Sequence, residues 1–392
     1  MSRFWSHRTL AAASALSAAV FVAPCSAPGG GGGEGSSAGS VAVAMPPIKH
    51  VFLIVLENQG YDTTFAPTTR ATYLADTLTK QGALLKQYYG IGHFSLDNYI
   101  AMISGMPATG LTQIDCPRFV DFVQTGTAEG IPVGAGCVYP ASVKTIANQL
   151  EARTYTWRGY MEDMGADSTR EAAACGHPTI GQPDSTEWAT PKDQYATKHN
   201  PFMYFHSVID SPSCKRRIVP LPALLKDLES SSTTSNFSFI TPNLCHDGHD
   251  RPCVNGEPGG SESANLFLKR WVPIITQSQA FRDDGLLIIT FDEALSLDRT
   301  SCCGQVPGPN ARVAQDGLFG GGRIGAVLIS RYIKPSTVSE TPYNHYSLLR
   351  SVEDIFGLGH LGYAQQKSVT SFGDDIFTAA GSPASSDGTS RP

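Results

Sequence analysis

Two long hydrophobic runs that end abruptly at acidic residues constrain the fold of this chain more than any other feature. Residues 50–58 read His-Val-Phe-Leu-Ile-Val-Leu-Glu-Asn, and residues 286–293 read Leu-Leu-Ile-Ile-Thr-Phe-Asp-Glu. Apolar runs of this length that are rich in β-branched residues are typical of buried parallel strands. Because ligands bind at the carboxyl ends of such strands, we predict that the acids at the ends of both runs share one site.

The rest of the chain alternates between strand-like and helix-like segments from about residue 46. At 392 residues, of which 41% are hydrophobic, the chain is long enough to bury a large core. This alternation predicts an α/β fold, a three-layer α/β/α sandwich in which helices cover both faces of a mainly parallel central sheet. The expected strands are 50–56, 237–241, 286–291 and 324–330, and the expected helices include 141–153, 221–230 and 345–356.

Residues 105–220 are rich in Gly, Pro, Asp and Cys and show little periodicity, so we expect a loop-rich insertion that is pinned by disulfides and forms one wall of the site. The chain has nine cysteines, and the even number beyond Cys25 is typical of disulfides in an exported protein. Cys302 and Cys303 either bond to each other or pair elsewhere. The pairs favoured by proximity are Cys116–Cys137 and Cys245–Cys253.

The first residues have the features of an export signal, because Arg3 and Arg8 precede an apolar stretch that is too short to span a bilayer comfortably. This pattern and the composition at both ends predict the domain organisation. We assign residues 1–27 to a signal peptide or lipoprotein leader, 28–46 to a Gly/Ser-rich linker, 47–376 to a single catalytic domain and 377–392 to a disordered tail.

Two hypotheses for the processing of the leader stay open. Val22-Ala23-Pro24-Cys25 resembles a bacterial lipobox, in which a lipidated Cys25 would tether the protein to the membrane as a cell-surface lipoprotein. Cleavage after Ala27 would instead release a secreted or periplasmic protein. Both hypotheses predict export.

The acidic pairs that follow the two hydrophobic runs are candidate metal ligands. A hard divalent cation prefers oxygen ligands from carboxylates and amides, and Glu57 with Asn58 supplies both kinds. Asp292 and Glu293 follow the other run. A single acid at a strand end more often caps a helix or faces solvent, but two acid-tipped strands favour a shared cation site.

Ser95 is a candidate nucleophile because it precedes a segment, 96–105, that we expect to form a helix. Unpaired backbone N–H groups at a helix N-terminus favour developing negative charge, and an adjacent cation would lower the pKa of the hydroxyl. Serine is also a preferred helix cap. The residues alone therefore leave both interpretations open.

A set of segments, spread in order over about 48–360, carries a resemblance to a known family. These segments are Glu57-Asn58 with Tyr61-Asp62-Thr63-Thr64-Phe65, His93-Phe94-Ser95-Leu96-Asp97-Asn98-Tyr99 with Ser104-Gly105, Lys198-His199-Asn200-Pro201-Phe202, Pro242-Asn243 with Asp247, His249 and Asp250, Phe291-Asp292-Glu293, 322–327 and 344–349. Together they resemble the phosphoesterase family of bacterial and fungal acid phosphatases and non-haemolytic phospholipases C, within the alkaline phosphatase superfamily. Asp97 departs from the pattern, since a proline is more usual there.

The resemblance implies an alkaline phosphatase-like fold and a nucleophile, Ser95, that forms a phosphoserine intermediate. It also implies one divalent metal ion, held by Glu57, Asn58, Asp292 and Glu293 and touched by the Ser95 oxygen. Oxygen-rich ligands suit Ca²⁺, Mg²⁺ or Mn²⁺, and histidine participation would admit Zn²⁺.

The resemblance implies further roles for an amide and for histidines. Asn98 would donate its amide to a non-bridging phosphoryl oxygen and stabilise the charge that develops there. One histidine should protonate the leaving group, and His249 and His199 are the best candidates. His345 is an alternative that would orient the phosphoryl group. Asp247 would orient His249, bind the metal or have a structural role.

These features predict an exported, metal-dependent phosphoesterase that hydrolyses small phosphate monoesters as acid phosphatases do. Two alternatives stay open. One is a phospholipase C or phosphodiesterase that acts on lipid head groups, and the other is a surface binding protein that keeps the fold without turnover. The chain has a net charge of −6 and no Lys/Arg run, which argues against a nucleic-acid partner.

Overall fold

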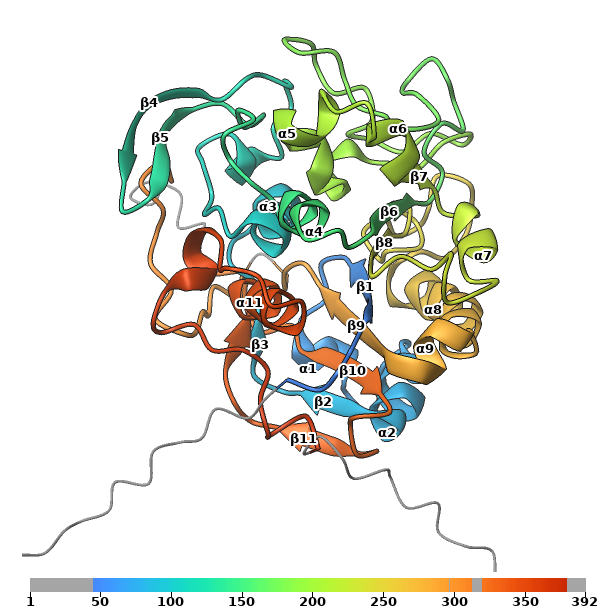
Figure 1. Ribbon diagram of the computed structural model, residues 1–392. Helices are drawn as coiled ribbons and strands as arrows, with labels where there is room; N and C mark the ends of the chain where they lie inside the picture. The colour runs from blue at the N-terminus through green and yellow to red at the C-terminus, as the bar shows by residue number, and fades with distance from the viewer. Residues whose placement is uncertain (1–44, 296, 312–318, 379–392) are drawn as a thin grey trace, which may run out of the picture. The chain divides into compact units, whose positions relative to one another are not determined.

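The computed structural model describes residues 45–295, 297–311 and 319–378, which belong to one compact unit. A central sheet is surrounded by helices (Figure 1). The strands are β1 His50–Leu56, β2 Ala83–Leu85, β3 Tyr88–Tyr89, β4 Val123–Ala128, β5 Ile131–Ala135, β6 Trp157–Met161, β7 Ile218–Pro220, β8 Phe237–Thr241, β9 Gly285–Phe291, β10 Ala326–Ser330, β11 Thr337–Ser339 and β12 Tyr343–Asn344.

Helices of very different length cover this sheet. The α-helices are α1 Tyr61–Thr64, α2 Thr79–Gln81, α3 Ser95–Ser104, α4 Ile146–Ala152, α5 His206–Ile209, α6 Cys214–Arg217, α7 Ala223–Asp227, α8 Gly260–Thr276, α9 Gln279–Asp284 and α11 His345–Ile355. The π- and 3-10-helical segments are η1 Tyr73–Leu78, η2 Thr112–Ile114, η3 Thr197–His199, η4 Pro201–Tyr204 and η5 Gly362–Gln365. None of the helices in the described ranges is long and apolar enough to cross a membrane.

The predicted leader at 1–27 and nearly all of the predicted linker at 28–46 and tail at 377–392 lie outside the described residues. Phe377, the first residue assigned to the tail, is buried and forms a β-bridge with Ile333. The packed part of the chain therefore extends at least to this residue.

The central sheet has eight strands in the order β11-β2-β10-β9-β1-β8-β6-β7. Strands β9, β1, β8, β6 and β7 are parallel neighbours. Strand β10 is antiparallel to both β9 and β2, and β11 is parallel to β2. Only β10 therefore runs against the other strands of this sheet, which confirms the mainly parallel sheet predicted from the sequence.

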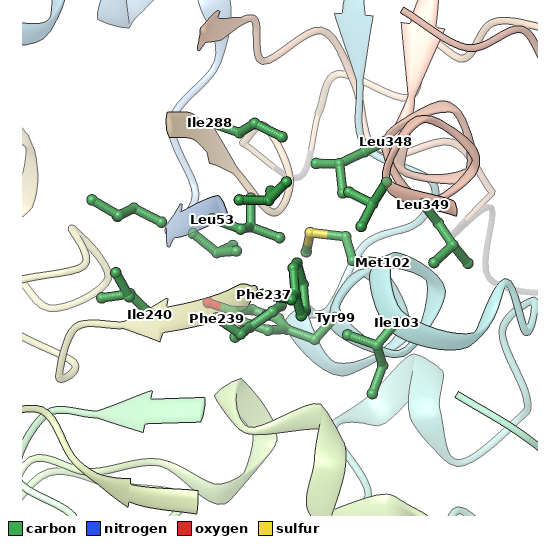
Figure 2. Packing of buried hydrophobic residues seen from close by; sticks show 14 of the residues in the cluster. Leu53, Tyr99, Met102, Ile103, Phe237, Phe239, Ile240, Ile288, Leu348 and Leu349 are labelled. Carbon is green, nitrogen blue, oxygen red and sulfur yellow. The ribbon is translucent and has the colours of Figure 1, made fainter. Parts of the chain in front are cut away.

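Alternate side chains of β1 show why helices cover both faces of the sheet. Neighbouring residues of a strand point to opposite faces. The Phe52 ring lies 6.3 Å from that of Phe281 in α9, whereas Leu53 packs in the cluster that Met102 of α3 and Leu348 of α11 complete (Figure 2). All seven residues of β1 are buried, as expected for a strand covered on both faces. The predicted three-layer arrangement is confirmed.

The four predicted strands are present as β1, β8, β9 and β10. The segment 105–220 is loop-rich as expected, but it also contributes β6 and β7, which the sequence did not predict. Strand β6 reads Trp-Arg-Gly-Tyr-Met, so it shows neither a long apolar run nor a clean alternation. Its polar groups are satisfied by tertiary contacts, since Arg158 and Tyr160 both donate to the carboxylate of Asp227.

Four disulfides join the cysteines of the described residues. The two pairs favoured by proximity in the sequence are formed, and Cys302 is bonded to Cys303. The remaining pair joins Cys175 to Cys214, a separation that proximity could not indicate. Two of the four bonds lie within 105–220, where they pin the loop-rich segment as expected.

Helix α11 buries one carboxylate, Glu353, which is fully shielded from solvent. Burial raises the pKa of Glu353 to about 8, although the side chain accepts a hydrogen bond from the N–H of Leu361 at 2.9 Å. The folded state therefore binds a proton there between the ordinary pKa of a glutamate and pH 8. By linkage, this contribution to stability is fully present at low pH and is lost as the pH rises towards 8.

We predict that Glu353→Gln removes the loss of stability that the wild type shows as the pH rises towards 8. The free energy of unfolding of the wild type should fall relative to that of the variant, by up to about 1.4 kcal/mol per pH unit between pH 5 and 8, measured by urea unfolding across that range. Glu229→Gln, at an exposed site, is the control and should track the wild type. A constant difference between Glu353→Gln and wild type across the range would contradict the assignment.

Candidate active site

The candidate active site lies at the carboxyl ends of β8, β1 and β9, which are neighbours in the sheet. The parallel register pairs Leu56 with Phe291, so the next residues, Glu57 and Asp292, leave the sheet side by side. The N–H of Asp292 donates to the carbonyl of Leu56 at 2.9 Å, and the N–H of Glu57 donates to the carbonyl of Asp247 at 2.8 Å. Asp247 lies in the loop after β8, so three strand ends bring three carboxylates together.

All three carboxylates are fully buried. Burial, followed by the negative charges of Asp292 and Asp247, raises the pKa of Glu57 well above its usual value. Burial also raises the pKa values of Asp247 and Asp292. Because both burial and like charge favour the neutral acid, the three groups cannot all ionise without a positively charged partner.

His199, on η3, faces two of these carboxylates. Its Nε2 lies 3.4 Å from Glu57 Oε1, and its Nδ1 lies 3.2 Å from Asp247 Oδ2. The ring stacks on that of Tyr99, with 5.2 Å between the centroids, and the Tyr99 hydroxyl donates to Glu57 Oε1 at 2.5 Å. Burial lowers the pKa of His199 well below its usual value, so the ring is neutral and offers a lone pair.

Several polar atoms of this cluster lack a hydrogen bond. Within the described ranges, no hydrogen bond of good geometry reaches Asp292 Oδ2, Asp247 Oδ2 or either ring nitrogen of His199. An unpaired buried polar group costs about 1–3 kcal/mol. Ligand atoms of Glu57, His199 and Asp247 lie within 4.8 Å of one another, and carboxylate oxygens with a neutral imidazole nitrogen are suitable ligands for a divalent cation. The donor set therefore fits a metal ion.

Ser95 is the first residue of α3, and its side chain points to the same cluster. Its hydroxyl donates to Glu57 Oε2 at 2.9 Å. The preceding residue, Phe94, has a φ of 77°, a conformation that is strained for a bulky side chain and that clusters at functional sites. The carboxylate of Asp115 accepts a hydrogen bond from the N–H of Leu96 at 3.0 Å and so ties the first turn of α3 to η2.

Asn98 fixes the loop that leads into α3. Its side-chain oxygen accepts from the N–H of Ile91 at 2.8 Å, and its amide donates to the carbonyls of Gly92 and Phe94 at 3.0 and 3.2 Å. Both amide hydrogens therefore have partners in this structure. The role as a phosphoryl-oxygen donor that the family resemblance implied stays a prediction, and the observed contacts give Asn98 a positioning role.

Glu293 holds the same loop from the other side. Its carboxylate accepts from the N–H of Phe94 at 3.1 Å and bonds to the ring of His93. The other ring nitrogen of His93 lies 2.8 Å from the carbonyl of Asp298. Each carboxylate oxygen keeps a second lone pair, so Glu293 as a metal ligand also stays a prediction.

A cavity of about 310 Å³ opens beside Ser95. It is lined by Asn58, His93, Phe94, Ser95, Asp115, Glu187, Trp188, Lys198, His249 and Glu293. Another cavity, of about 480 Å³, is larger, but none of the predicted site residues lines it. The reactive groups that line the smaller cavity make it the candidate substrate-binding site.

Lys198 is the only lysine or arginine among the described residues that line the smaller cavity. Its Nζ lies 3.0 Å from Asp115 Oδ2, and both side chains are nearly buried. Although burial lowers it, the pKa of Lys198 is raised overall because of the charge of Asp115 and its hydrogen bond. The Lys198 side chain thus places a permanent positive charge in a cavity that is also lined by three acidic side chains.

The predicted histidines occupy different places. His249 lines the cavity, and its Nδ1 lies 2.8 Å from the Asp250 carboxylate. His199 is not among the residues that line the cavity, and its ring lies between the carboxylates of Glu57 and Asp247. His345 is fully buried behind Asp292, where its Nε2 lies 2.5 Å from the Asp292 carbonyl, so it does not reach the cavity. Of these three, only His249 lines the cavity.

The structure also identifies residues that the sequence did not single out. The sequence indicates no separate role for Tyr99, because its hydrogen bond to Glu57 depends on how α3 is placed against the strand ends. Lys198 and Asp115 are separated by 83 residues, so no local pattern indicates their ion pair. The only sequence signal for Lys198 was its position next to His199 in one motif, and this position did not indicate what Lys198 does.

A model of the phosphoesterase family matches residues 67–359, most of the chain. The chain belongs to the phosphoesterase family. The matched range contains Ser95, His199, His249 and Asp292, and Glu57 lies just before it.

Curated relatives agree with this assignment. The chain is 29% identical over 285 residues to the phosphate-repressible acid phosphatase of Penicillium chrysogenum, which covers 73% of this chain and 54% of that protein. It is 26% identical over 314 residues to a probable acid phosphatase of Kluyveromyces lactis, with 80% and 59% covered. The chain thus spans little more than half the length of these two fungal relatives.

A bacterial relative and a solved structure are also similar to this chain. The phosphatidylinositol-3-phosphatase of Mycobacterium tuberculosis is 25% identical over 326 residues, which cover 83% of each chain. A solved structure of a protein in the alkaline phosphatase superfamily from Vibrio parahaemolyticus aligns with 83% of this chain and 72% of its own, with a TM-score of 0.48 and 12% identity. The latter likeness is too low to support a conclusion about function.

We predict that a divalent cation stabilises the folded chain through the carboxylate cluster. Adding Mn²⁺, Mg²⁺, Ca²⁺ or Zn²⁺ to chelator-treated protein should raise the Tm by about 5 °C at a hundredfold excess over Kd, because the ion binds the folded state alone. Asp247→Asn should lose most of this rise, yet should not lower the Tm of the metal-free protein, since it removes a like charge.

The exposed carboxylate of Asp374 provides the matched control. Asp374→Asn should keep the full metal-induced rise in the same differential scanning experiment. If no divalent ion shifts the Tm of the wild type, or if Asp247→Asn responds as the wild type does, the cluster is not a metal site.

Proposed function

We propose that this chain is an exported, metal-dependent phosphoesterase that hydrolyses phosphate monoesters through a phosphoserine intermediate. One observation carries the proposal: the hydroxyl of Ser95, at the N-terminus of α3, donates to a buried carboxylate of the cluster at 2.9 Å and also lines the cavity. A nucleophile, a proton acceptor and a set of cation ligands therefore meet at one point.

Glu57, Asp292, Asp247 and His199 would hold the metal ion, with Ser95 adjoining it. When bound, the ion would lower the pKa of the Ser95 hydroxyl and offset negative charge on the phosphoryl group. Of the ligands predicted from the sequence, Glu57 and Asp292 belong to this cluster. Asn58 and Glu293 line the adjoining cavity, where they would complete the coordination.

The protein's own residues account for the transfer of the phosphoryl group. Ser95 Oγ attacks phosphorus, and Glu57 Oε2 accepts the proton that it already receives as a hydrogen bond. As the new O–P bond forms, the bond from phosphorus to the ester oxygen breaks. His249, which lines the cavity and is oriented by Asp250, donates a proton to the departing oxygen. Water then attacks phosphorus and gives a proton to His249, while the bond from phosphorus to Ser95 Oγ breaks. Glu57 returns the proton to that oxygen, and inorganic phosphate leaves.

Lys198 would bind the non-bridging phosphoryl oxygens. A phosphate monoester is a dianion, and a site lined by Asp115, Glu187 and Glu293 would repel it without a compensating charge. Lys198 supplies a permanent positive charge at the cavity, and Asp115 holds it in place at 3.0 Å. Its position supports a role in recognition of the substrate.

A lipid phosphomonoester is the second candidate substrate, and the phosphatidylinositol-3-phosphatase relative, which matches over 83% of both chains, favours it. Cleavage of a lipid phosphodiester and a binding protein without turnover are the remaining alternatives. Four disulfides in the described residues support an oxidising compartment. Attachment to a membrane through a lipidated Cys25 remains a hypothesis.

We predict that Ser95→Ala lowers kcat for p-nitrophenyl phosphate at least about a thousandfold, because the covalent route is lost. Ser104→Ala, at the other end of α3, is the control and should keep activity. Parallel assays with p-nitrophenylphosphorylcholine separate the monoester from the diester activity, and preference for the choline ester would move the assignment to phospholipase C. Wild-type rates in Ser95→Ala would show that another group is the nucleophile.

We predict that removing the charge of Lys198 weakens binding of monoesters. Lys198→Met is best made together with Asp115→Asn, because the double variant leaves no unpaired buried charge. Relative to Asp115→Asn alone, the double variant should raise KM for p-nitrophenyl phosphate about tenfold with a smaller change in kcat. Lys144→Met, on the exposed surface, should change neither constant. An unchanged KM in the double variant would exclude contact between Lys198 and the phosphoryl group.

A further inference from the structure

Two exposed aromatic side chains line the cavity beside Ser95. Phe94 is 41% exposed and Trp188 is 74% exposed, and among the described phenylalanine and tryptophan residues these are the exposed ones. Both line the same cavity of about 310 Å³. Exposed aromatic surface that gathers at one site is a mark of binding. Since neither ring is needed in the core, their shared position calls for a ligand.

The backbone of Trp188 is fixed although its ring is free. The side chain of Arg170 is 8% exposed, and it donates to three backbone carbonyls of the segment that carries the tryptophan. Its Nη2 donates to the carbonyl of Trp188 at 2.7 Å, its Nη1 to that of Asp193 at 2.6 Å and its Nε to that of Ser185 at 3.1 Å. A nearly buried cation thus holds an exposed indole at the cavity rim.

The same segment is tied to the residues that contact the substrate. The hydroxyls of Thr186 and Thr197 lie 2.8 Å apart, and the N–H of Thr197 donates to the Thr186 hydroxyl at 2.8 Å. Thr197 directly precedes Lys198, which we place at the phosphoryl group. The position of Trp188 is therefore set relative to the phosphoryl-binding end of the cavity, and less ordering is required when a ligand binds.

The second ring is fixed by the geometry of the nucleophile. Phe94 directly precedes Ser95, has a φ of 77° and donates its N–H to Glu293 at 3.1 Å. A phenylalanine in this conformation is strained. A glycine would adopt the same backbone conformation without strain and would keep the turn. Retaining a large ring there indicates that the ring itself has a use.

We propose that Phe94 and Trp188 form a subsite for a planar aromatic ring in the leaving group of the substrate, an inference that rests on the proposed phosphomonoesterase activity. Aromatic faces recognise planar rings by stacking, whatever polar groups those rings carry. Glu187, which also lines the cavity, disfavours a second anionic group. The substrate class is thus a phosphate monoester with an aromatic ring close to the ester oxygen: an aryl phosphate, phosphotyrosine or a nucleoside monophosphate.

Competitive inhibition by phosphonates tests the subsite without the reactivity of the leaving group. Phenylphosphonate should inhibit hydrolysis of glycerol 3-phosphate more tightly than methylphosphonate does. Trp188→Ala should weaken inhibition by phenylphosphonate about five- to tenfold and leave that by methylphosphonate unchanged, whereas Trp188→Phe should keep most of the preference. Leu266→Ala, which removes an exposed apolar side chain of α8, is the control and should change neither inhibition constant.

Tryptophan fluorescence provides a readout that does not depend on turnover. Trp157 and Trp271 are buried, so quenching by phenylphosphonate that is present in the wild type and absent in Trp188→Phe reports on the subsite. Quenching without any hydrolysis would separate a failure of the proposed function from a failure of this inference. No difference in quenching between the two proteins would overturn the inference.

Aromatic substrates, each compared with a substrate that has an alkyl leaving group, show which kind of ring the subsite binds. The kcat/KM for a nucleoside 5′-monophosphate relative to glycerol 3-phosphate, and for phosphotyrosine relative to phosphoserine, shows which ring the site prefers. Trp188→Ala should reduce at least one of these ratios about five- to tenfold. If Trp188→Ala weakens both phosphonates equally, or leaves both ratios at wild-type values, the aromatic subsite does not exist.

Discussion

The convergence of Glu57, Asp247 and Asp292 at three neighbouring strand ends is the constraint on which the rest of the structure depends. The register of β1 against β9 sets two of the carboxylates side by side, and a backbone bond from Glu57 fixes the loop of the third. Burial makes their joint ionisation unfavourable. A bound cation would offset their negative charge and favour the ionised carboxylates. This arrangement is costly for stability alone, and it is understandable as a binding site.

The core and the site are continuous through α3. Tyr99 packs with Phe239 of β8 in the same core in which Leu53 and Met102 meet (Figure 2), and its hydroxyl bonds to Glu57. The helix thus packs its apolar face against the sheet while its first residue, Ser95, meets the carboxylates. Packing of the core therefore sets the position of Ser95, the proposed nucleophile, as sites built on rigid elements require.

Local patterns predicted the central strands of the sheet and the convergence of Glu57 and Asp292. The apolar runs at 50–56 and 286–291 indicated the central strands, and the acids that follow them lie together as the edge of a parallel sheet requires. The distinction between His199 and His249 was not accessible, because it depends on which ring faces the carboxylates and which faces the cavity. The strand β6 was missed because its polar residues are satisfied only by tertiary contacts.

We propose that Ser95 carries the phosphoryl group between the substrate and water, and trapping the covalent intermediate would establish this role. The enzyme is mixed with p-nitrophenyl phosphate and divalent metal, quenched in acid within the first turnover, digested and examined by mass spectrometry. We expect a phosphoryl group on the peptide that contains Ser95, and none when metal is withheld. A phosphoryl group on another serine or on a threonine, or none on the Ser95 peptide while the ester is being hydrolysed, would contradict this role of Ser95.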